Sequence, residues 1–363
     1  MAVDWTIIFP LIVGGLITFQ GATSTVLGRI GGPAFATWFV FTVSILPALI
    51  LFLVETKAGA TVNFAQSAAN APWFSYFGGF MGPFVVWSVL TCVPEIGVNL
   101  CFSIQVSAQL FNALLSQHFG IIGVVKRDTS VGMIVGFSMT VAGVVVILIA
   151  RLRTTQLVPL QDAESVTRAI NAPETTPESI EFLATDDSLV PDSLEKEQRQ
   201  NEAPPKPVAV SLLRYGFCIL ISVLSGMGES MQAGMNSTLG MHYGSAGFAT
   251  LVVACVSFVP CSIAFAVEYV RRPTNFRKFR AETPWWCYPC GFVGFAVATM
   301  FSYLPQRLDS SVLMGAFVCA QVLSSLAADH FGWMELAVSR VTIMKAFGAT
   351  LLIGGVIVMS VLN

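Results

Sequence analysis

Apolar residues along this chain gather in long runs, in which polar positions are few and do not alternate with apolar ones. A run of about 20 apolar residues can cross the roughly 30 Å hydrocarbon layer of a bilayer as a helix. The alternation of a membrane β-barrel strand is missing. The pattern predicts ten transmembrane helices near residues 6–27, 34–54, 72–92, 97–117, 131–150, 212–235, 246–267, 284–304, 311–328 and 343–362.

The second half of the chain repeats the first at an offset of 212 residues. The recurring residues include Gln20 and Gln232, Ala108-Gln109 and Ala320-Gln321, Pro72-Trp73 and Pro284-Trp285, and His118-Phe119-Gly120 and His330-Phe331-Gly332. We infer a tandem duplication, with five-helix repeats at 1–153 and 211–363. Because five is odd, the second repeat starts on the opposite side of the membrane. The expected fold is therefore an all-α multi-pass membrane protein with ten transmembrane helices as two inverted five-helix repeats, a transporter pattern.

The segment between the repeats, residues 154–210, has a different composition. It holds eleven acidic and four basic residues, with Pro, Ser and Thr throughout. Such a segment buries too little apolar area to offset its ordering entropy, so we predict a disordered acidic linker. The chain as a whole has only 11% charged residues, against about 25% in soluble domains. This contrast excludes a soluble fold for the two repeats.

Basic residues predict which face of the membrane carries the linker. In the predicted topology, 15 Lys and Arg residues lie on the linker face and 4 on the other, namely Lys57, Lys126, Arg127 and Arg307. Short cytoplasmic loops carry the excess of Lys and Arg. We therefore expect a cytoplasmic linker and both termini on the opposite side, in a plasma membrane or a bacterial inner membrane. The first repeat alone is nearly balanced, so this orientation depends on the second.

One stretch of the first repeat carries a resemblance to a known family. It runs from Trp73 through Gly79, Gly82 and Pro94 to Ala108-Gln109 and His118-Phe119-Gly120, and it is preceded by Gln20, Leu27-Gly28 and Phe35-Ala36-Thr37. It resembles the bacterial YdcZ-like five-helix exporters of the drug/metabolite transporter superfamily, and both repeats match. The resemblance implies a ten-helix fold, a central path between the halves and export of small molecules. The long linker departs from the family pattern.

Glu229 is the acidic residue that lies deepest in a predicted span. Its repeat partner Ile17 comes twelve residues after Trp5, about 18 Å along a helix. No other carboxylate lies at such depth, and Glu55, Glu268 and Asp329 fall at span ends. A buried acid is costly unless it is paired, neutralised or facing water. Glu229 could alternate between holding a proton and a cationic substrate, or it could simply be a protonated residue bonded to a neighbouring helix.

Paired amides are the next candidates for substrate binding. Gln20 with Gln232, and Gln109 with Gln321, sit in mid-helix in repeat-related positions, with Asn112 within one turn of Gln109. Amides offer donors and acceptors without the cost of a charge, which suits a central cavity. The alternative is hydrogen bonding between helices that holds the bundle together.

Glycines predict close helix packing. Small residues let helix backbones approach in a membrane, and they recur in the fifth and tenth predicted helices as Gly132, Gly136, Gly143, Gly348 and Gly355. Because these two helices are repeat partners, we expect them to cross at the interface between the repeats. We assign these glycines to packing and not to substrate binding.

Cysteine and histidine give no convincing chemical motif. Cys287 and Cys290 form a thioredoxin-like C-x-x-C, but this motif opens a predicted transmembrane helix instead of following a strand. Their repeat counterparts are Ser75 and Gly78. The other six cysteines appear scattered among the apolar runs as small hydrophobes. With three His and no paired carboxylates nearby, we expect no metal site and no cofactor.

Two classes of function remain. The first is a secondary transporter that rocks the inverted repeats around a midplane site, coupled to protons through Glu229, with the bilayer and a small molecule as partners and no nucleic acid. Fusion of both repeats would let such a protein work as a monomer. The alternative is a non-transporting scaffold whose acidic linker recruits partners. No clustered nucleophile or acid–base pair supports an enzyme.

Overall fold

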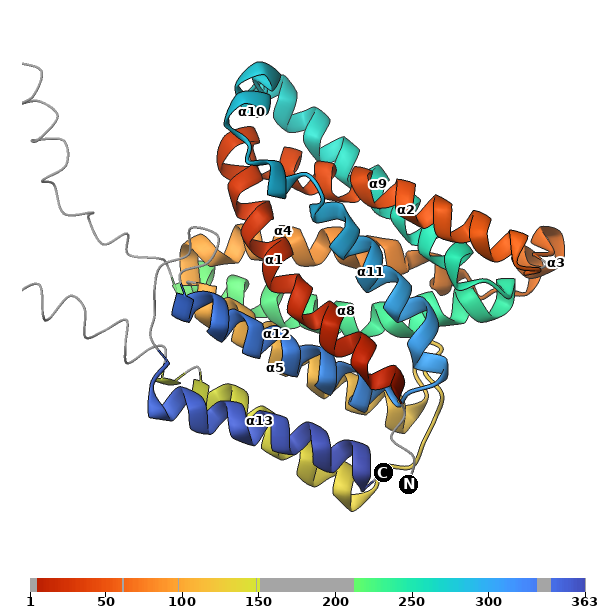
Figure 1. The fold of residues 1–363 in the computed structure, drawn as a ribbon, viewed down its shortest axis with the longest axis vertical. Helices are drawn as coiled ribbons and strands as arrows, with labels where there is room; N and C mark the ends of the chain where they lie inside the picture. Colours follow the sequence, from red (N-terminus) through yellow and green to blue (C-terminus); the bar gives the residue numbers. More distant parts are fainter. Residues whose placement is uncertain are drawn as a thin grey trace, which may run out of the picture.

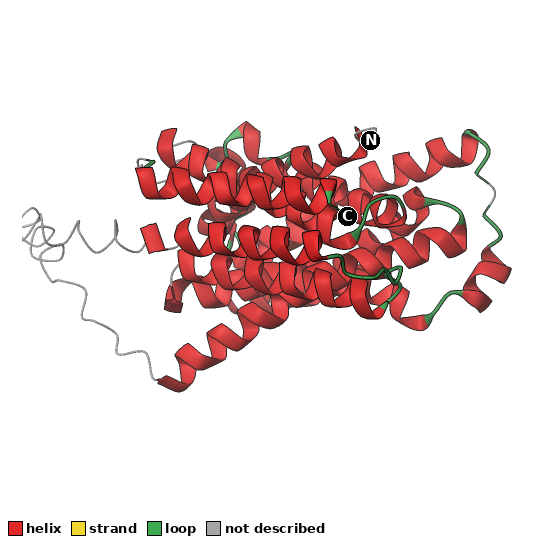
Figure 2. Ribbon diagram, turned by 90° about the horizontal axis from the view of Figure 1, so that it is seen from below, coloured by secondary structure: helices red, strands yellow, loops and turns green. Residues whose placement is uncertain are grey.

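The computed structural model of the protein describes residues 5–60, 62–96, 98–147, 149–150, 212–331 and 341–362. The predicted linker at 154–210 lies outside the described residues. Within them the chain is helical, without a strand (Figure 2). All ten predicted spans are confirmed as long helices: α1 (Ile8–Gly31), α2 (Pro33–Lys57), α4 (Gly78–Ile96), α5 (Val98–Phe119), Val131–Ile147, α8 (Leu212–Tyr243), α9 (Ala246–Arg271), α11 (Cys290–Tyr303), α12 (Ser310–Phe331) and α13 (Ile343–Val361).

Short helical segments join some of the long ones, and the apolar pattern did not predict them. They are α3 (Phe64–Asn70) and α10 (Phe276–Glu282), with the 3₁₀ turns η1 (Trp5–Ile7), η2 (Trp73–Phe77), η3 (Trp285–Cys287) and η4 (Leu304–Gln306). The helices α3 and α10 follow the 212-residue offset, and each begins at an asparagine cap. The Asn63 side chain accepts a hydrogen bond from Gln66 N, and the Asn275 side chain accepts one from Lys278 N. Each cap satisfies one of the free N–H groups at a helix start.

The second helices of the two repeats, α2 and α9, pack together in opposite directions (Figure 1). Near the end of α2, Glu55 accepts hydrogen bonds from Gly247 N (3.0 Å) and Ser245 Oγ (2.6 Å) at the start of α9. Near the end of α9, Glu268 accepts one from Ala34 N (2.7 Å) at the start of α2. Equivalent helices thus make the same contact in both directions. The repeats are therefore related by a pseudo-two-fold axis perpendicular to the helices, which is the inverted arrangement.

Glycines at two further interfaces obey the same symmetry. A Cβ at Gly14 would collide with the Phe317 carbonyl oxygen, and a Cβ at Gly226 would collide with the Gln105 carbonyl oxygen. Both pairs are related by the 212-residue offset. Only glycine permits this approach of α1 to α12 and of α8 to α5.

The Val131–Ile147 helix and α13 meet through glycines that face one another. A Cβ at Gly143 would lie 2.6 Å from the Gly348 carbonyl oxygen, and one at Gly348 would lie 2.8 Å from that of Gly143. Gly136 and Gly355 are related in the same way, at 2.6 and 2.5 Å. Gly132, by contrast, lies against Leu362. The earlier glycine of one helix contacts the later glycine of the other, so these two helices also run antiparallel.

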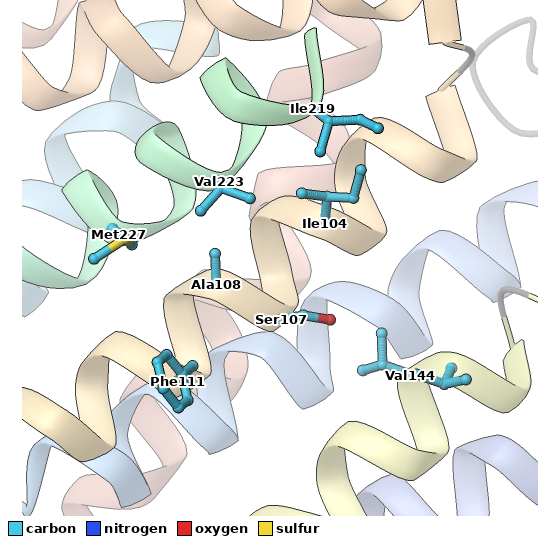
Figure 3. A pocket seen from close by; sticks show the side chains of 9 residues that line it. Ile104, Ser107, Ala108, Phe111, Val144, Ile219, Val223 and Met227 are labelled. Atoms are coloured by element: carbon cyan, nitrogen blue, oxygen red, sulfur yellow. The ribbon is translucent and has the colours of Figure 1, made fainter. Parts of the chain in front are cut away.

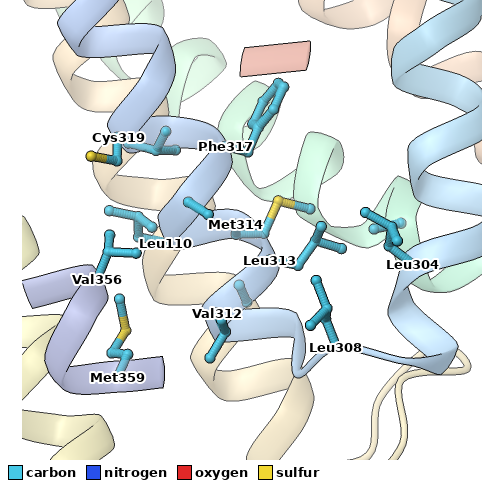
Figure 4. Close-up of a cluster of buried hydrophobic side chains, with 14 of the residues drawn as sticks. Leu110, Leu304, Leu308, Val312, Leu313, Met314, Phe317, Cys319, Val356 and Met359 are labelled. Atoms are coloured by element: carbon cyan, nitrogen blue, oxygen red, sulfur yellow. The ribbon is translucent and has the colours of Figure 1, made fainter. Parts of the chain in front are cut away.

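The largest apolar core surrounds α12, which lies between α1, α5 and α13 (Figure 4). Leu313, Met314 and Phe317 are fully buried there. Lipid tails are as apolar as these side chains, so dispersion contacts and hydrogen bonds between helices, and not transfer out of water, hold such a bundle together. The polar and glycine contacts between repeats are therefore the specific determinants of the fold.

The first turn of α12 is held by polar groups of the first repeat. Gln117 Oε1 accepts hydrogen bonds from Ser311 N (3.0 Å) and Ser311 Oγ (2.9 Å). Asp309, just before the helix, forms an ion pair with Arg127. Burial raises the pKa of the Asp309 carboxyl, and the neighbouring Arg127 guanidinium only partly opposes that effect. These contacts join the end of α5 and the loop after it to the second repeat.

Candidate functional site

A cavity of about 90 Å³ lies between α1, α2 and α4 of the first repeat and α8, α9 and α11 of the second. Seven repeat-related pairs, that is 14 of its 17 lining residues, surround it. Five pairs are 212 residues apart, namely Ile17 and Glu229, Gln20 and Gln232, Gly82 and Gly294, Val85 and Val297, and Val86 and Ala298. Two more, Phe41 and Ala254 and Ser44 and Ser257, are 213 apart, because the register of the repeat shifts by one residue in the second helix. The cavity therefore lies on the pseudo-two-fold axis.

Three polar side chains on this cavity have no partner. Among the described residues, Glu229, Gln20 and Gln232 form no side-chain hydrogen bond or ion pair. The serine hydroxyls that line the cavity are satisfied by backbone carbonyl groups. Ser44 donates to Phe41 O (2.7 Å), and Ser257 Oγ lies within hydrogen-bond distance of Val253 O (2.8 Å) on its own helix and of Gly79 O (2.5 Å) on α4. The free hydrogen-bonding capacity of the cavity is thus concentrated in one carboxyl group and two amides.

Glu229 lies near the middle of α8, 17 residues after Leu212 and 14 before Tyr243. It is the only carboxylate among the cavity-lining residues, and its repeat partner across the axis is the apolar Ile17. An ionised carboxylate at this depth is costly without a partner. A proton or a cationic group in the cavity would remove that cost.

The remaining candidate amides lie elsewhere, at contacts between the repeats. Gln109 Nε2 donates to Met314 Sδ (3.4 Å), and Asn112 Nδ2 donates to Met227 O (3.2 Å) and to Ser230 Oγ. Neither side chain lines the cavity. The geometry gives both residues a role in joining α5 to α12 and α8.

Gln321 also lies away from the cavity, on α12 beside α1. Thr18 Oγ1 donates to Gln321 O (3.3 Å) and pairs with Ser324 Oγ (2.6 Å). The pairs Thr18–Ser324 and Ser230–Asn112 occupy repeat-related positions. One contact thus joins α1 to α12, and its equivalent joins α8 to α5.

A buried polar cluster between α4 and α5 of the first repeat and α8 of the second was not predicted from the sequence. Gln105 Nε2 donates to Ser88 Oγ (2.7 Å) and Ser225 Oγ (3.0 Å), and all three residues are buried. Their repeat counterparts are the apolar Phe317, Met300 and Val13. A search for polar residues that recur in both repeats misses such a cluster, because its residues are polar in only one repeat. The signal that could have found it is a polar residue whose counterpart is apolar.

The cysteines are less scattered than the sequence indicated. Cys92, Cys101 and Cys218 come together in one buried apolar cluster of α4, α5 and α8. Cys287 and Cys290 are fully buried in another, and neither forms a disulfide with a described residue. No group of three or more metal-ligating residues occurs within the described ranges. These thiols pack as small apolar side chains.

A second, larger cavity of about 500 Å³ lies between α5, α8 and the Val131–Ile147 helix (Figure 3). It is lined by Ile104, Ser107, Ala108, Phe111, Val144, Val145, Ile219, Val223 and Met227. Ser107 supplies its only side-chain polar group. Such a lining offers little hydrogen bonding to orient a polar solute, so this cavity is not the candidate site.

Two inverted five-helix repeats with a cavity on their common axis define a multi-pass membrane protein of the transporter class. A family model described as "Putative inner membrane exporter, YdcZ" matches the chain twice, at residues 5–146 and 217–358. The chain belongs to this family, as a tandem-duplicated form.

A solved structure, described as "Crystal structure of protein", has the same fold. Its TM-score is 0.57, 16% of the residues are identical, and 97% of each chain is covered. No curated protein matches the sequence.

Proposed function

We propose that the protein exports a small molecule by alternating access, with the cavity on the pseudo-two-fold axis as the binding site. The supporting observation is that three unpartnered polar side chains, Gln20 from one repeat and Glu229 and Gln232 from the other, face this cavity. Rocking of one repeat against the other exposes a midplane site to each side in turn. A site on the axis keeps ligands from both repeats in either state. Because both repeats belong to one chain, the monomer is the proposed transport unit.

Glu229 has the coupling role in this proposal. Its carboxyl group exchanges a proton for a positively charged group of the substrate, because either one removes the cost of an unpaired charge at this depth. Gln20 and Gln232 supply amide donors and acceptors from opposite sides of the axis. Substrate and proton therefore compete for one site, which couples their movements in opposite directions.

The size of the cavity limits what this state can hold. About 90 Å³ corresponds to roughly three water molecules at ~30 Å³ each. Pockets for drug-sized ligands measure roughly 300–1,000 Å³. The substrate is therefore small, or the cavity widens when the repeats rock.

The test combines a ligand screen with proton-flux measurements. Thermal shift of the purified protein against small metabolites and permanent cations such as tetramethylammonium selects the ligand. In proteoliposomes with an entrapped pH dye, that ligand should drive proton movement through the wild type. We expect Glu229→Gln to lower this flux to the level of protein-free liposomes, because the amide cannot bind a proton, while the variant stays folded.

The repeat supplies a matched control. In Glu229→Ile/Ile17→Glu the carboxyl group moves to the related position across the axis, still on the cavity, and coupled flux should persist. Unchanged coupled flux in Glu229→Gln would rule out the coupling role. Absence of ligand-driven flux in the folded wild type would instead favour the scaffold alternative.

A further inference from the structure

The short helices α3 and α10 connect the second and third long helices of the two repeats, and the fold builds both in the same way. Both begin at an asparagine cap. In both, the first aromatic ring also packs edge-on against the second long helix of the other repeat. Phe64 meets Phe248 at 5.4 Å between ring centroids, and Phe276 meets Phe35 at 6.0 Å. The 212-residue offset relates Phe64 to Phe276. The first repeat therefore serves as an internal control for what the second one adds.

The two connections differ sharply in charge. Residues 58–72 contain no charged side chain, whereas residues 270–284 contain five basic residues and one acidic residue. The basic residues are Arg271, Arg272, Arg277, Lys278 and Arg280, here called the basic patch. Because α3 forms the same helix without any charge, the fold does not require the basic patch.

The charges of the basic patch are available for binding. All five side chains are exposed. Lys278 lies 3.9 Å from Glu282, and both groups are largely in solvent, so this pair is weak. The four arginines form no ion pair with any residue that the structure describes.

Aromatic side chains place the basic patch at the level of the lipid headgroups. Trp285, just after α10, has 82% of its surface exposed, and Tyr269 and Phe276 are also exposed. Exposed Trp and Tyr rings collect at the boundary between lipid tails and water. Phe279, in contrast, is buried 4.7 Å from the Phe35 ring. This anchor fixes α10 to the bundle and leaves its basic side chains outside.

We propose that the basic patch binds the headgroups of anionic phospholipids. Five like charges within ten residues, at headgroup depth and with the weak Lys278–Glu282 pair as their only ion pair among the described residues, match the phosphates of such lipids. Each Lys or Arg near an anionic surface contributes roughly fivefold in affinity. The repeat-related connection has no equivalent, because residues 58–72 are uncharged. The proposed lipid contact is thus a property of the α10 connection and not of its repeat counterpart at α3.

The experiment measures headgroup preference beside α10. The full-length protein is placed in mixed micelles with brominated phosphatidylglycerol or brominated phosphatidylcholine, both of which quench tryptophan fluorescence. Subtracting the signal of Trp285→Phe isolates the reporter next to the basic patch. We expect preferential quenching by phosphatidylglycerol, lost in 1 M salt, where the screening length is about 3 Å. Soluble glycerol phosphate should not compete, which separates lipid binding from capture of a free phosphate.

Two double variants test the residues. Arg277→Gln/Arg280→Gln should lower the phosphatidylglycerol preference about 25-fold, two factors of roughly five. Lys57→Gln/Lys126→Gln removes the same charge from exposed positions elsewhere and should leave the preference unchanged. Equal preference in the two double variants, or a preference that survives 1 M salt, would overturn the proposal.

A graft onto the other repeat completes the test. Ala65 and Ala68 of α3 are the repeat counterparts of Arg277 and Arg280, and Trp73 is the counterpart of Trp285. Adding Ala65→Arg/Ala68→Arg should create a phosphatidylglycerol preference at Trp73, which is also exposed. If the folded double variant showed no phosphatidylglycerol preference at Trp73, the proposal that the arginine charges alone create this preference would be contradicted.

Discussion

At the residue scale, Glu55 and Glu268 show how one carboxylate can connect two repeats. Both stand at the ends of predicted spans, where a charge at the membrane surface needs no further explanation. The structure places each at the start of the partner repeat's second helix, where N–H groups lack intrahelical acceptors. The positive end of the helix dipole also favours an anion there.

We expect Glu55→Ala and Glu268→Ala each to lower the free energy of unfolding by about 1 kcal/mol, the usual value of a lost N-terminal cap. Their effects should add, because the two sites lie about 30 Å apart along α2. Denaturant unfolding in detergent measures both quantities. The exposed Glu282→Ala serves as the control, and losses no larger than its own would contradict the capping role.

The candidate site was predictable only in part from single residues. Gln20, Gln232 and Glu229 were selected for their mid-membrane positions, and the structure brings all three to one cavity. Gln109 was selected by the same criterion but faces Met314. Depth along a helix follows from counting residues. The direction in which a side chain points depends on the neighbouring helix, which the sequence of one span does not contain.

At the scale of elements, the long helices were predictable because their length is fixed by the membrane. The short helices α3 and α10 were not, because seven residues are too few to show an apolar period. Asn63 and Asn275, which recur at the repeat offset, were the available signal. In a duplicated chain, a short helix can thus be predicted from a capping residue that recurs at the same position in both repeats.

The glycine contacts between the Val131–Ile147 helix and α13 make a prediction about packing. Gly143→Ala and Gly348→Ala should each destabilise the protein by roughly 1–3 kcal/mol, because the added methyl group would overlap a backbone carbonyl oxygen. Thermal unfolding in detergent measures the loss. Gly15→Ala is the matched control, since a Cβ there meets nothing within 4 Å. Equal stability of Gly143→Ala and Gly15→Ala would contradict the close approach.

At the scale of the whole molecule, the inverted repeats place α3 and α10 at opposite ends of the bundle (Figure 1). The linker face remains a prediction from the distribution of basic residues. Single cysteines at the related positions Ala65 and Arg277, in a chain whose eight native cysteines are replaced, test both points. A membrane-impermeant maleimide should label Ala65→Cys on intact cells, and Arg277→Cys only after permeabilisation. Labelling of both from the same side would contradict the inverted topology.

The single carboxylate on the axis has a consequence for stoichiometry. If two separate copies of one repeat formed the same bundle, an acid at this position would occur twice. Two like charges would then face each other in a cavity of about 90 Å³. Fusion of the repeats lets the two positions diverge into Glu229 and Ile17. A cavity with one acidic group binds at most one proton there, so each turnover of the proposed exchange carries one proton against one positively charged group.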